Sequence, residues 1–173
     1  MDATALLMAD HKKVEKLFKD FEKLEDAEEK RALVEKCCTS LKIHTQIEEE
    51  IFYPAARGAL KEADLLNEAE VEHATAKDLI EQLASYDGED EKDDAKFTVL
   101  AEYIRHHVKE EQNEMFPKLK KSKGLDLQEI GEQLKQRKEE LMSEMGVDPM
   151  EVEEESPRKR ASTQAPRMAA KRR

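Results

Sequence analysis

The sequence of 173 residues contains no tryptophan, and aromatic residues make up only 5% of it. Glycine and proline occur five times each. Sandwiches and barrels need many turns and strands rich in aromatic and β-branched residues, so this composition argues against them. Charged residues make up 41% of the chain. The fold class that the composition predicts is all-α, with one hydrophobic core.

The chain also lacks any apolar stretch of membrane-spanning length, and its first ten residues do not resemble a signal peptide. Its only cysteines, Cys37 and Cys38, are neighbours, and a disulfide between them would be badly strained. A cysteine-based zinc site would need about four well-spaced ligands. We therefore expect a cytoplasmic protein with no membrane partner, no disulfide framework and no cysteine metal site.

Basic residues are scarce in the body of the chain. The whole sequence has 30 basic and 41 acidic residues, a formal charge of −11. Residues 156–173 hold seven basic residues and no acidic one, so residues 1–155 carry a charge of −18. This balance argues against a basic nucleic-acid-binding face on the body.

Capping residues and chain breakers divide the sequence into five helical segments. Asp26 and Asp126 each precede a glutamate by three residues, as in a capping box, while Arg57-Gly58 and Asp87-Gly88 interrupt the helical pattern. The predicted helices cover about residues 2–24, 26–56, 60–85, 90–121 and 126–145. Because the connections are short, the first four helices are predicted to form an up-down-up-down four-helix bundle, with the fifth packed outside it.

Residues 1–146 therefore form one predicted domain, and residues 147–173 a predicted disordered tail. The tail passes from an acidic run at 151–155 to basic runs and shows no apolar periodicity. It cannot bury enough apolar surface to offset the entropy lost on ordering. Its basic end could bind DNA phosphates weakly at low salt, although the acidic body opposes this contact.

An internal repeat is the most informative feature. In each of two segments a histidine is followed by a glutamate after four residues and by a proline after ten. These residues are His44, Glu48 and Pro54, and His107, Glu111 and Pro117. Asp10-His11 stands 33 residues before the first segment, and Glu72-His73 stands 34 residues before the second. The chain therefore contains two copies of one helix pair.

The repeated histidines fall on the apolar stripes of their helices. His11 lies on the stripe of Leu7 and Phe18, and Glu48 and Glu111 share a helix face with the histidine one turn before them. A single histidine there would more often be a hydrogen-bonded core residue, but four in repeat register indicate a metal site. Burying two ionised carboxylates unpaired would cost several kcal/mol each, against a net stability of about 5–15 kcal/mol. Two cations resolve this conflict, and imidazole with carboxylate favours iron or manganese over structural zinc.

The paired segments resemble the hemerythrin-like domain, also called the HHE cation-binding domain, over about residues 3–120. The resemblance rests on the doubled His-x-x-x-Glu spacing, the endings Ile-Phe-Tyr-Pro and Glu-Met-Phe-Pro, and the upstream Asp-His and Glu-His pairs. It implies a non-haem centre of two iron ions with an oxo or hydroxo bridge. The implied ligands are His11 and His44 for one iron, His73 and His107 for the other, and Glu48 and Glu111 as bridges.

One position departs from the oxygen-carrying members of that family. They have a further histidine one turn beyond the third ligand, and this position is Lys77 here. The remaining ligand set is similar to that of bacterial iron-centre repair and nitric-oxide-stress proteins and of iron-sensing members. The resemblance therefore disfavours reversible oxygen carriage.

Other polar residues near the repeat have lesser predicted roles. Tyr103, one turn before His107, is expected to pack on the ligand face or to hydrogen-bond a bridging group there. His106 is expected to face solvent, because it is rotated about 100° from its neighbour. Asp10 and Glu72 could hydrogen-bond the adjacent histidines, but consecutive helical residues diverge, so both are expected to face solvent.

Three functions fit these features. The favoured one is a metal-binding protein or sensor that handles iron, dioxygen, nitric oxide or peroxide, because six protein ligands leave open positions for a diatomic ligand or peroxide. The second is a di-iron enzyme with iron-centre repair or peroxidase-like activity. The third is a nucleic-acid-associated protein that acts through its basic tail. The sequence contains no phosphate-binding loop and no hydrolase triad.

Overall fold

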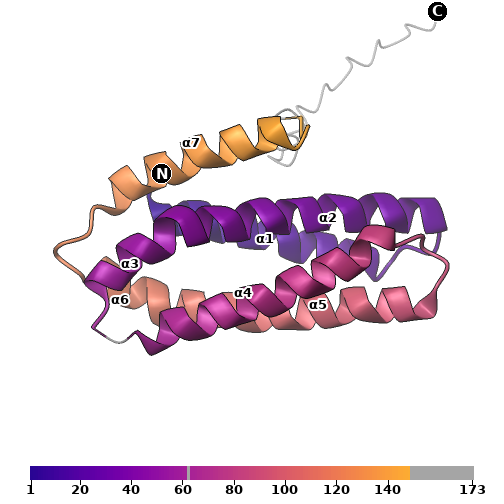
Figure 1. The fold of residues 1–173 in the computed structure, drawn as a ribbon, viewed down its shortest axis with the longest axis horizontal. Helices are drawn as coiled ribbons and strands as arrows, with labels where there is room; N and C mark the ends of the chain where they lie inside the picture. The colour runs from indigo at the N-terminus through magenta and orange to yellow at the C-terminus, as the bar shows by residue number, and fades with distance from the viewer. Residues whose placement is uncertain (62, 149–173) are drawn as a thin grey trace, which may run out of the picture.

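The computed structural model describes residues 1–61 and 63–148, and this part of the chain contains helices and turns but no strand (Figure 1). The all-α prediction is confirmed. The α-helices are α1 (Ala3–Phe21), α2 (Ala27–Ile47), α3 (Tyr53–Ala59), α4 (Asp64–Gln82), α5 (Glu91–Glu110), α6 (Phe116–Lys120) and α7 (Leu127–Glu144). None of these helices is both long enough and apolar enough to cross a membrane. The predicted tail lies outside the described residues from position 149 onward.

Aspartate side chains begin four of the five long helices by accepting a backbone hydrogen bond in the first turn, which satisfies a donor that the helix leaves free. The capping residues are Asp2, Asp26, Asp90 and Asp126. α4 differs from its prediction, because it begins at Asp64 and not at Leu60. Leu60 has an extended backbone and ends the preceding helix, which continues through Arg57-Gly58 to Ala59.

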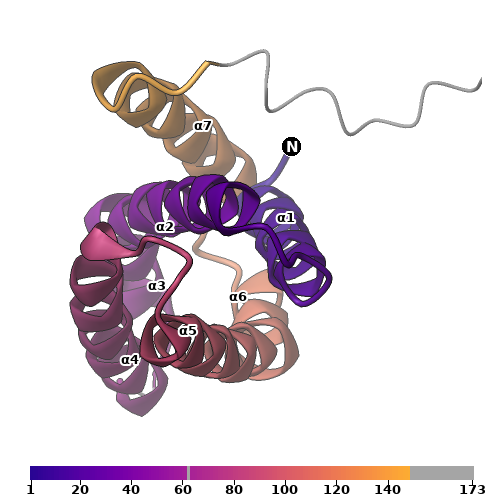
Figure 2. The same ribbon diagram turned by 90° about the vertical axis from the view of Figure 1, so that its right-hand side faces the viewer.

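Four long helices surround a common interior, and α7 lies outside them (Figure 2). α1 packs against α2 and α5, and α4 also packs against α2 and α5, whereas α7 packs on α1 and α2. Gly131 of α7 approaches the N-terminus so closely that a Cβ atom there would lie 2.4 Å from the Met1 carbonyl oxygen. Glycine at this position therefore allows α7 to seat against the start of α1.

A π-helical turn follows each helix that carries a glutamate of the repeat. Glu48–Phe52 joins α2 to α3, and Glu111–Met115 joins α5 to α6. Pro54 and Pro117 stand at the second positions of α3 and α6, and their rings would clash with the preceding turn of a regular helix. The sequence predicts a helix end at about Ala56, close to Pro54, but the wider turn lets the helix pass the proline and end at Ala59.

The interior consists of two apolar clusters with a polar layer between them. One cluster includes Leu7, Phe52 and the inner face of α7, and the other includes Phe18 and Phe97. On α1 and α4, the histidine of the repeat lies between residues of one cluster and residues of the other. His44 and His107 lie close to the same boundary, since Leu41 and Ile104 belong to one cluster and Ile47 and Met115 to the other. The histidines therefore form a layer in the middle of the molecule, shielded from water on both sides.

Candidate metal centre

Four buried histidines bring their Nε2 atoms together in two pairs. The Nε2 atoms of His11 on α1 and His44 on α2 lie 3.2 Å apart, and those of His73 on α4 and His107 on α5 lie 3.0 Å apart. Each residue is at most 6% exposed. Each pair thus joins the two helices of one repeat copy, and all four histidines point inward as the repeat predicts.

Glu48 and Glu111 connect the two histidine pairs. Glu48 Oε1 lies 3.1 Å from His44 Nε2, and its Oε2 lies 3.1 Å from His73 Nε2. The two oxygens of Glu111 make the same connection, each 3.2 Å from an Nε2 atom of a different pair. The six predicted ligands therefore form two groups of four that share both carboxylates, with the donor atoms of each group within 4.8 Å of one another.

The cluster concentrates charge away from solvent. Glu48 is fully buried and Glu111 is 1% exposed, and one oxygen of each accepts no hydrogen bond. Burial disfavours a charged His44, but the carboxylates of Glu48 and Asp10 outweigh it and raise the pKa of His44 to about 10. Burial likewise opposes charge on His107, and Glu111 outweighs it and raises the pKa of His107 to about 11. Without a cation, protons on imidazole therefore balance the carboxylates.

Two metal cations fit this donor set. Imidazole nitrogen and carboxylate oxygen are suitable ligands for iron and manganese. A cation within one group would replace protons on the imidazoles and would bind carboxylate oxygens that accept no hydrogen bond. Each group of four donors could therefore hold one cation, and the two carboxylates could bridge them.

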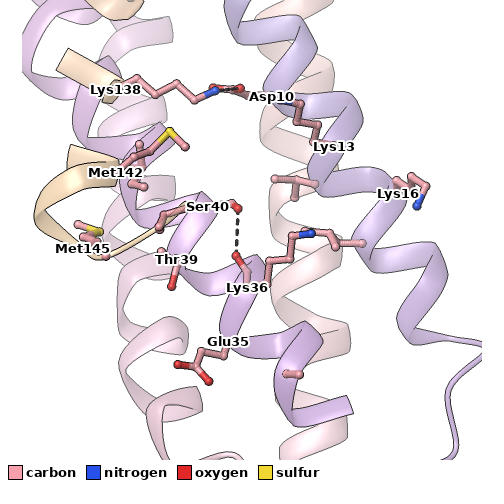
Figure 3. Close-up of a pocket in the computed structure, with 16 residues that line it drawn as sticks. Asp10, Lys13, Lys16, Glu35, Lys36, Thr39, Ser40, Lys138, Met142 and Met145 are labelled. Atoms are coloured by element: carbon pink, nitrogen blue, oxygen red, sulfur yellow. Dashed lines mark hydrogen bonds and ion pairs between the residues drawn. The ribbon is translucent and has the colours of Figure 1, made fainter. Parts of the chain in front are cut away.

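Each histidine also has a partner at Nδ1, outside the donor cluster. Asp10 lies 3.4 Å from His44 Nδ1, and Glu72 lies 3.4 Å from His107 Nδ1. The expectation that these acids face solvent is wrong, because each reaches the histidine of the facing helix and not its sequence neighbour. Asp10 in turn pairs with Lys138 of α7, at the edge of the groove between α1, α2 and α7 (Figure 3).

The other two partners directly follow the glutamates of the repeat. Glu49 Oε1 lies 3.0 Å from His73 Nδ1, and Glu49 Oε2 pairs with Lys77 at 2.5 Å. The side-chain amide of Gln112 lies 2.9 Å from His11 Nδ1. The carboxylates at His44, His107 and His73 can accept a hydrogen bond from Nδ1, which fixes the ring and leaves Nε2 available to a metal. The amide nitrogen of Gln112 can only donate, so Nδ1 of His11 accepts its hydrogen bond.

Tyr53 belongs to the centre, although the sequence analysis does not identify it. It is 1% exposed, and its hydroxyl donates to Glu111 Oε1 over 2.6 Å. The hydroxyl oxygen of Tyr53 also lies 3.1 Å from His73 Nε2 and 3.2 Å from His107 Nε2. Burial and the charges of Glu111 and Glu48 raise the pKa of Tyr53 well above its usual value. The side chain is therefore a neutral phenol in the metal-free centre.

The π turn explains why the spacing of a regular helix does not predict that Tyr53 points toward Glu48. Its backbone N–H bonds to the carbonyl of Glu48, five residues earlier, so the two side chains lie on one helix face. In a regular α-helix, residues five apart point in different directions. Pro54 is the available signal, because a proline that does not end a helix indicates an irregular turn just before it.

The exposed fractions of the Tyr103 and His106 side chains test two further predictions. Tyr103 is 44% exposed, so the prediction that it packs or hydrogen-bonds on the ligand face is wrong. Leu100 and Ile104 occupy the inner face of α5 instead. His106 is solvent-exposed, as predicted, and pairs with Glu110 at 3.1 Å.

Comparison with known proteins identifies the family. The family model described as the hemerythrin HHE cation binding domain matches residues 2–119. The fold is similar to that in the crystal structure of a hemerythrin HHE cation binding domain-containing protein from Mycobacterium kansasii, with a TM-score of 0.70 at 24% identity, covering 83% of this chain and 89% of that one. No curated protein matches the chain significantly. The family match spans both repeat copies, and the chain belongs to the hemerythrin HHE cation binding domain family.

Proposed function

We propose that this protein binds two non-haem iron ions and senses or handles iron, dioxygen, nitric oxide or peroxide. His11 and His44 hold one cation, His73 and His107 hold the other, and two glutamates bridge them. Manganese is the alternative metal, because it accepts the same nitrogen and oxygen donors. The proposal takes the helices in the up-down-up-down order that the sequence predicts, which the packing of α1 on α2 and of α4 on α5 supports.

The observation that carries the proposal is the sharing of both carboxylates by two groups of donors. Each group offers two imidazole nitrogens and one oxygen from each of Glu48 and Glu111. Four donors leave two positions of a six-coordinate cation without one of these six ligands. When bound, the cations would supply those positions to a small ligand, which suits a protein that responds to diatomic molecules or peroxide.

The residues around the donors hold this arrangement in place. The four Nδ1 partners orient the imidazole rings toward the centre, and the apolar clusters on either side exclude bulk water. Lys77 stands where oxygen-carrying relatives have a histidine, and it pairs with Glu49 outside the donor cluster. The absence of an imidazole at this position supports sensing or chemical handling over reversible oxygen carriage.

Metal analysis of the full-length protein tests the proposal. Protein loaded with Fe²⁺ under anaerobic conditions and freed of excess metal is expected to retain about two irons per chain, because the donors form two groups. Repeating the loading with Mn²⁺ in competition tests which metal the centre prefers. A ratio well below one iron per folded chain would contradict the two-iron proposal.

A further inference from the structure

The groove between α1, α2 and α7 differs from the acidic body of the protein in its charge (Figure 3). It has a volume of about 650 Å³, and four lysines and two acidic residues line it. The lysines are Lys13, Lys16, Lys36 and Lys138. Lys138 pairs with one of the acids, Asp10, so the other three lysines share the groove with one acid, Glu35. The groove is therefore a local excess of positive charge, which attracts carboxylates.

The floor of the groove is apolar. Val14 of α1, Ile43 of α2 and Met142 of α7 are each at most 7% exposed and belong to the buried clusters. Met145 also lines the groove and is 41% exposed. Lysine side chains add apolar stems to such a wall and carry their ammonium groups at its rim. The groove therefore fits a segment in which apolar side chains alternate with carboxylates.

The end of α7 turns the chain into this groove. Gly146 has a φ of 69°, and the N–H of Val147 bonds to the carbonyl of Met142, five residues earlier, over 2.9 Å. A left-handed glycine with this bond is the Schellman ending, which reverses the direction of the chain. Gly146 and Val147 both line the groove, and Val147 packs against the cluster that includes the inner face of α7. The predicted tail therefore begins inside the groove.

The next residues have the composition that the groove requires. From position 150 the sequence reads Met-Glu-Val-Glu-Glu-Glu. Successive side chains of an extended chain point to opposite sides, so the two apolar residues can face the floor while glutamates meet the lysines at the rim. Residues 148–155 span up to about 26 Å when extended. The groove follows α2 for about 16 Å, from Ala32 to Ile43, so the segment is long enough to fill it.

We infer that residues 149–155 bind in the groove of their own chain, with their glutamates paired with Lys13, Lys16 and Lys36. Exposed ion pairs are individually weak, so the binding also needs the apolar floor and the tether at Val147. A short tether gives the segment a millimolar effective concentration, which favours it over an acidic segment of another molecule. The inference concerns a surface outside the donor cluster and does not depend on bound metal.

The docked segment divides the predicted tail into two parts with different roles. The lysines of the groove hold the acidic part on the body, and residues 156–173, with seven basic residues and no acidic one, extend from it. In the absence of those lysines, the basic residues would pair with the neighbouring acidic run instead. The groove therefore keeps the basic end available to other anions.

Carbodiimide cross-linking of the full-length protein tests the inference, because this reagent joins a carboxylate to an amine only where the two are in contact. Peptide mass spectrometry of the monomer band is expected to find glutamates of 151–155 joined to Lys13, Lys16 or Lys36. Lys135 is the internal control. It is exposed and lies about 18 Å before Val147 along α7, within reach of the segment, but it does not line the groove. Its cross-links to the segment are expected to be absent.

A charge exchange provides the second test, read by the heteronuclear NOE of the backbone amides of 151–155. High values in wild-type protein are expected to fall in Lys13→Glu/Lys36→Glu and to return when Glu151→Lys and Glu153→Lys are added. Lys135→Glu is the matched control and is expected to keep them high. Circular dichroism checks that the helices of each variant form.

Three results would overturn the inference. Cross-links to Lys135 as frequent as those to the groove, or no cross-links to the groove, would mean that the segment does not bind there. Cross-links confined to a dimer band would assign the groove to the segment of a second copy. Low NOE values in wild-type protein, or high values that survive the charge reversal, would mean that the lysines do not hold the segment.

Discussion

The two halves of the molecule carry the same donors but differ in what surrounds them. Residues 3–59 and 64–120 each contribute two histidines and one glutamate, and in each half the second helix passes through a π turn before a proline. The sequence repeat accounts for these common features. The residues that contact the donors from outside occupy equivalent positions in the two copies, but they differ in chemistry and in what packs on them. They therefore determine how the two proposed metal positions differ.

The first half is covered by α7, and the second half has a polar face at the matching place. Ile43 and Ile47 of α2 are buried in the cluster that includes α7. The positions that match them in α5, 63 residues later, are His106 and Glu110, and the side chain of His106 is 64% exposed. Lys138 of α7 also reaches Asp10, where burial opposes ionisation but His44 and Lys138 outweigh it and lower the Asp10 pKa to about 2. The added helix therefore shields one proposed metal position and places a positive charge near it.

The residue after each bridging glutamate makes a second difference. Glu49 gives His73 a carboxylate partner, whereas Gln112 gives His11 a neutral amide. A carboxylate at Nδ1 raises the basicity of a metal-bound imidazole. Both histidines of the second half therefore have a carboxylate partner, and only one histidine of the first half does. This contrast favours tighter metal binding in the second half.

The largest expected loss of metal affinity comes from removing a carboxylate that belongs to both groups of donors. Glu48→Ala or Glu111→Ala is expected to weaken binding of both cations by more than about 100-fold, beyond the ~10–100-fold typical of outer partners. Anaerobic equilibrium dialysis with Fe²⁺ measures this loss. Glu114→Ala is the control, because Glu114 is an exposed acid in the same π turn as Glu111. Equal losses in Glu111→Ala and Glu114→Ala would mean that surface acidity binds the metal.

The next effect is a pH dependence that separates metal-free from metal-bound protein. The folded-state pKa values of His44 and His107 are raised from 6.5 to about 10 and about 11. Their contribution to metal-free stability is therefore complete below about pH 6.5 and is lost as the pH rises through these values. The pKa of Glu48 is lowered, because nearby imidazoles outweigh its burial and the charge of Glu111. Its contribution is present above its usual pKa and is lost in acid.

Metal-free protein is accordingly expected to be most stable between about pH 4.5 and 6.5, near the ordinary pKa values of glutamate and histidine. Each raised imidazole lowers its stability by at most about 1.4 kcal/mol per pH unit above that range. Metal binding requires neutral imidazoles, so iron affinity is expected to rise over the same range. Thermal melting of chelated and iron-loaded protein from pH 5 to 9 measures both trends. A stability gap between the two forms that does not widen with pH would contradict this assignment of protons.

Some residues of the centre could be predicted from the sequence and others could not. The difference is whether the direction of the side chain is set within one regular helix. His44 and Glu48 could be predicted because a spacing of four residues within a regular helix sets their common direction. Tyr53 could not, because its direction depends on a turn of irregular width. Asp10 could not, because its partner is 34 residues away in the chain and the contact depends on how two helices are rotated. Local periodicity thus predicts the donors, while packing between helices decides their outer partners.

The smallest expected effect comes from exchanging Glu49 and Gln112, the two residues that differ after the bridging glutamates. Glu49→Gln removes the carboxylate at His73 with almost no change in shape, and it is expected to weaken the tighter of two iron-binding steps by about tenfold. Gln112→Glu adds the missing carboxylate at His11, and it is expected to tighten the weaker step by a similar factor. Anaerobic Fe²⁺ titration resolves the two steps, with Glu114→Gln as the exposed control. Because one substitution weakens the tighter step and the other strengthens the weaker step, the affinities of the two steps should become more similar in both variants. If Glu49→Gln weakened both steps equally, the two halves would not bind metal independently enough for their outer partners to distinguish them.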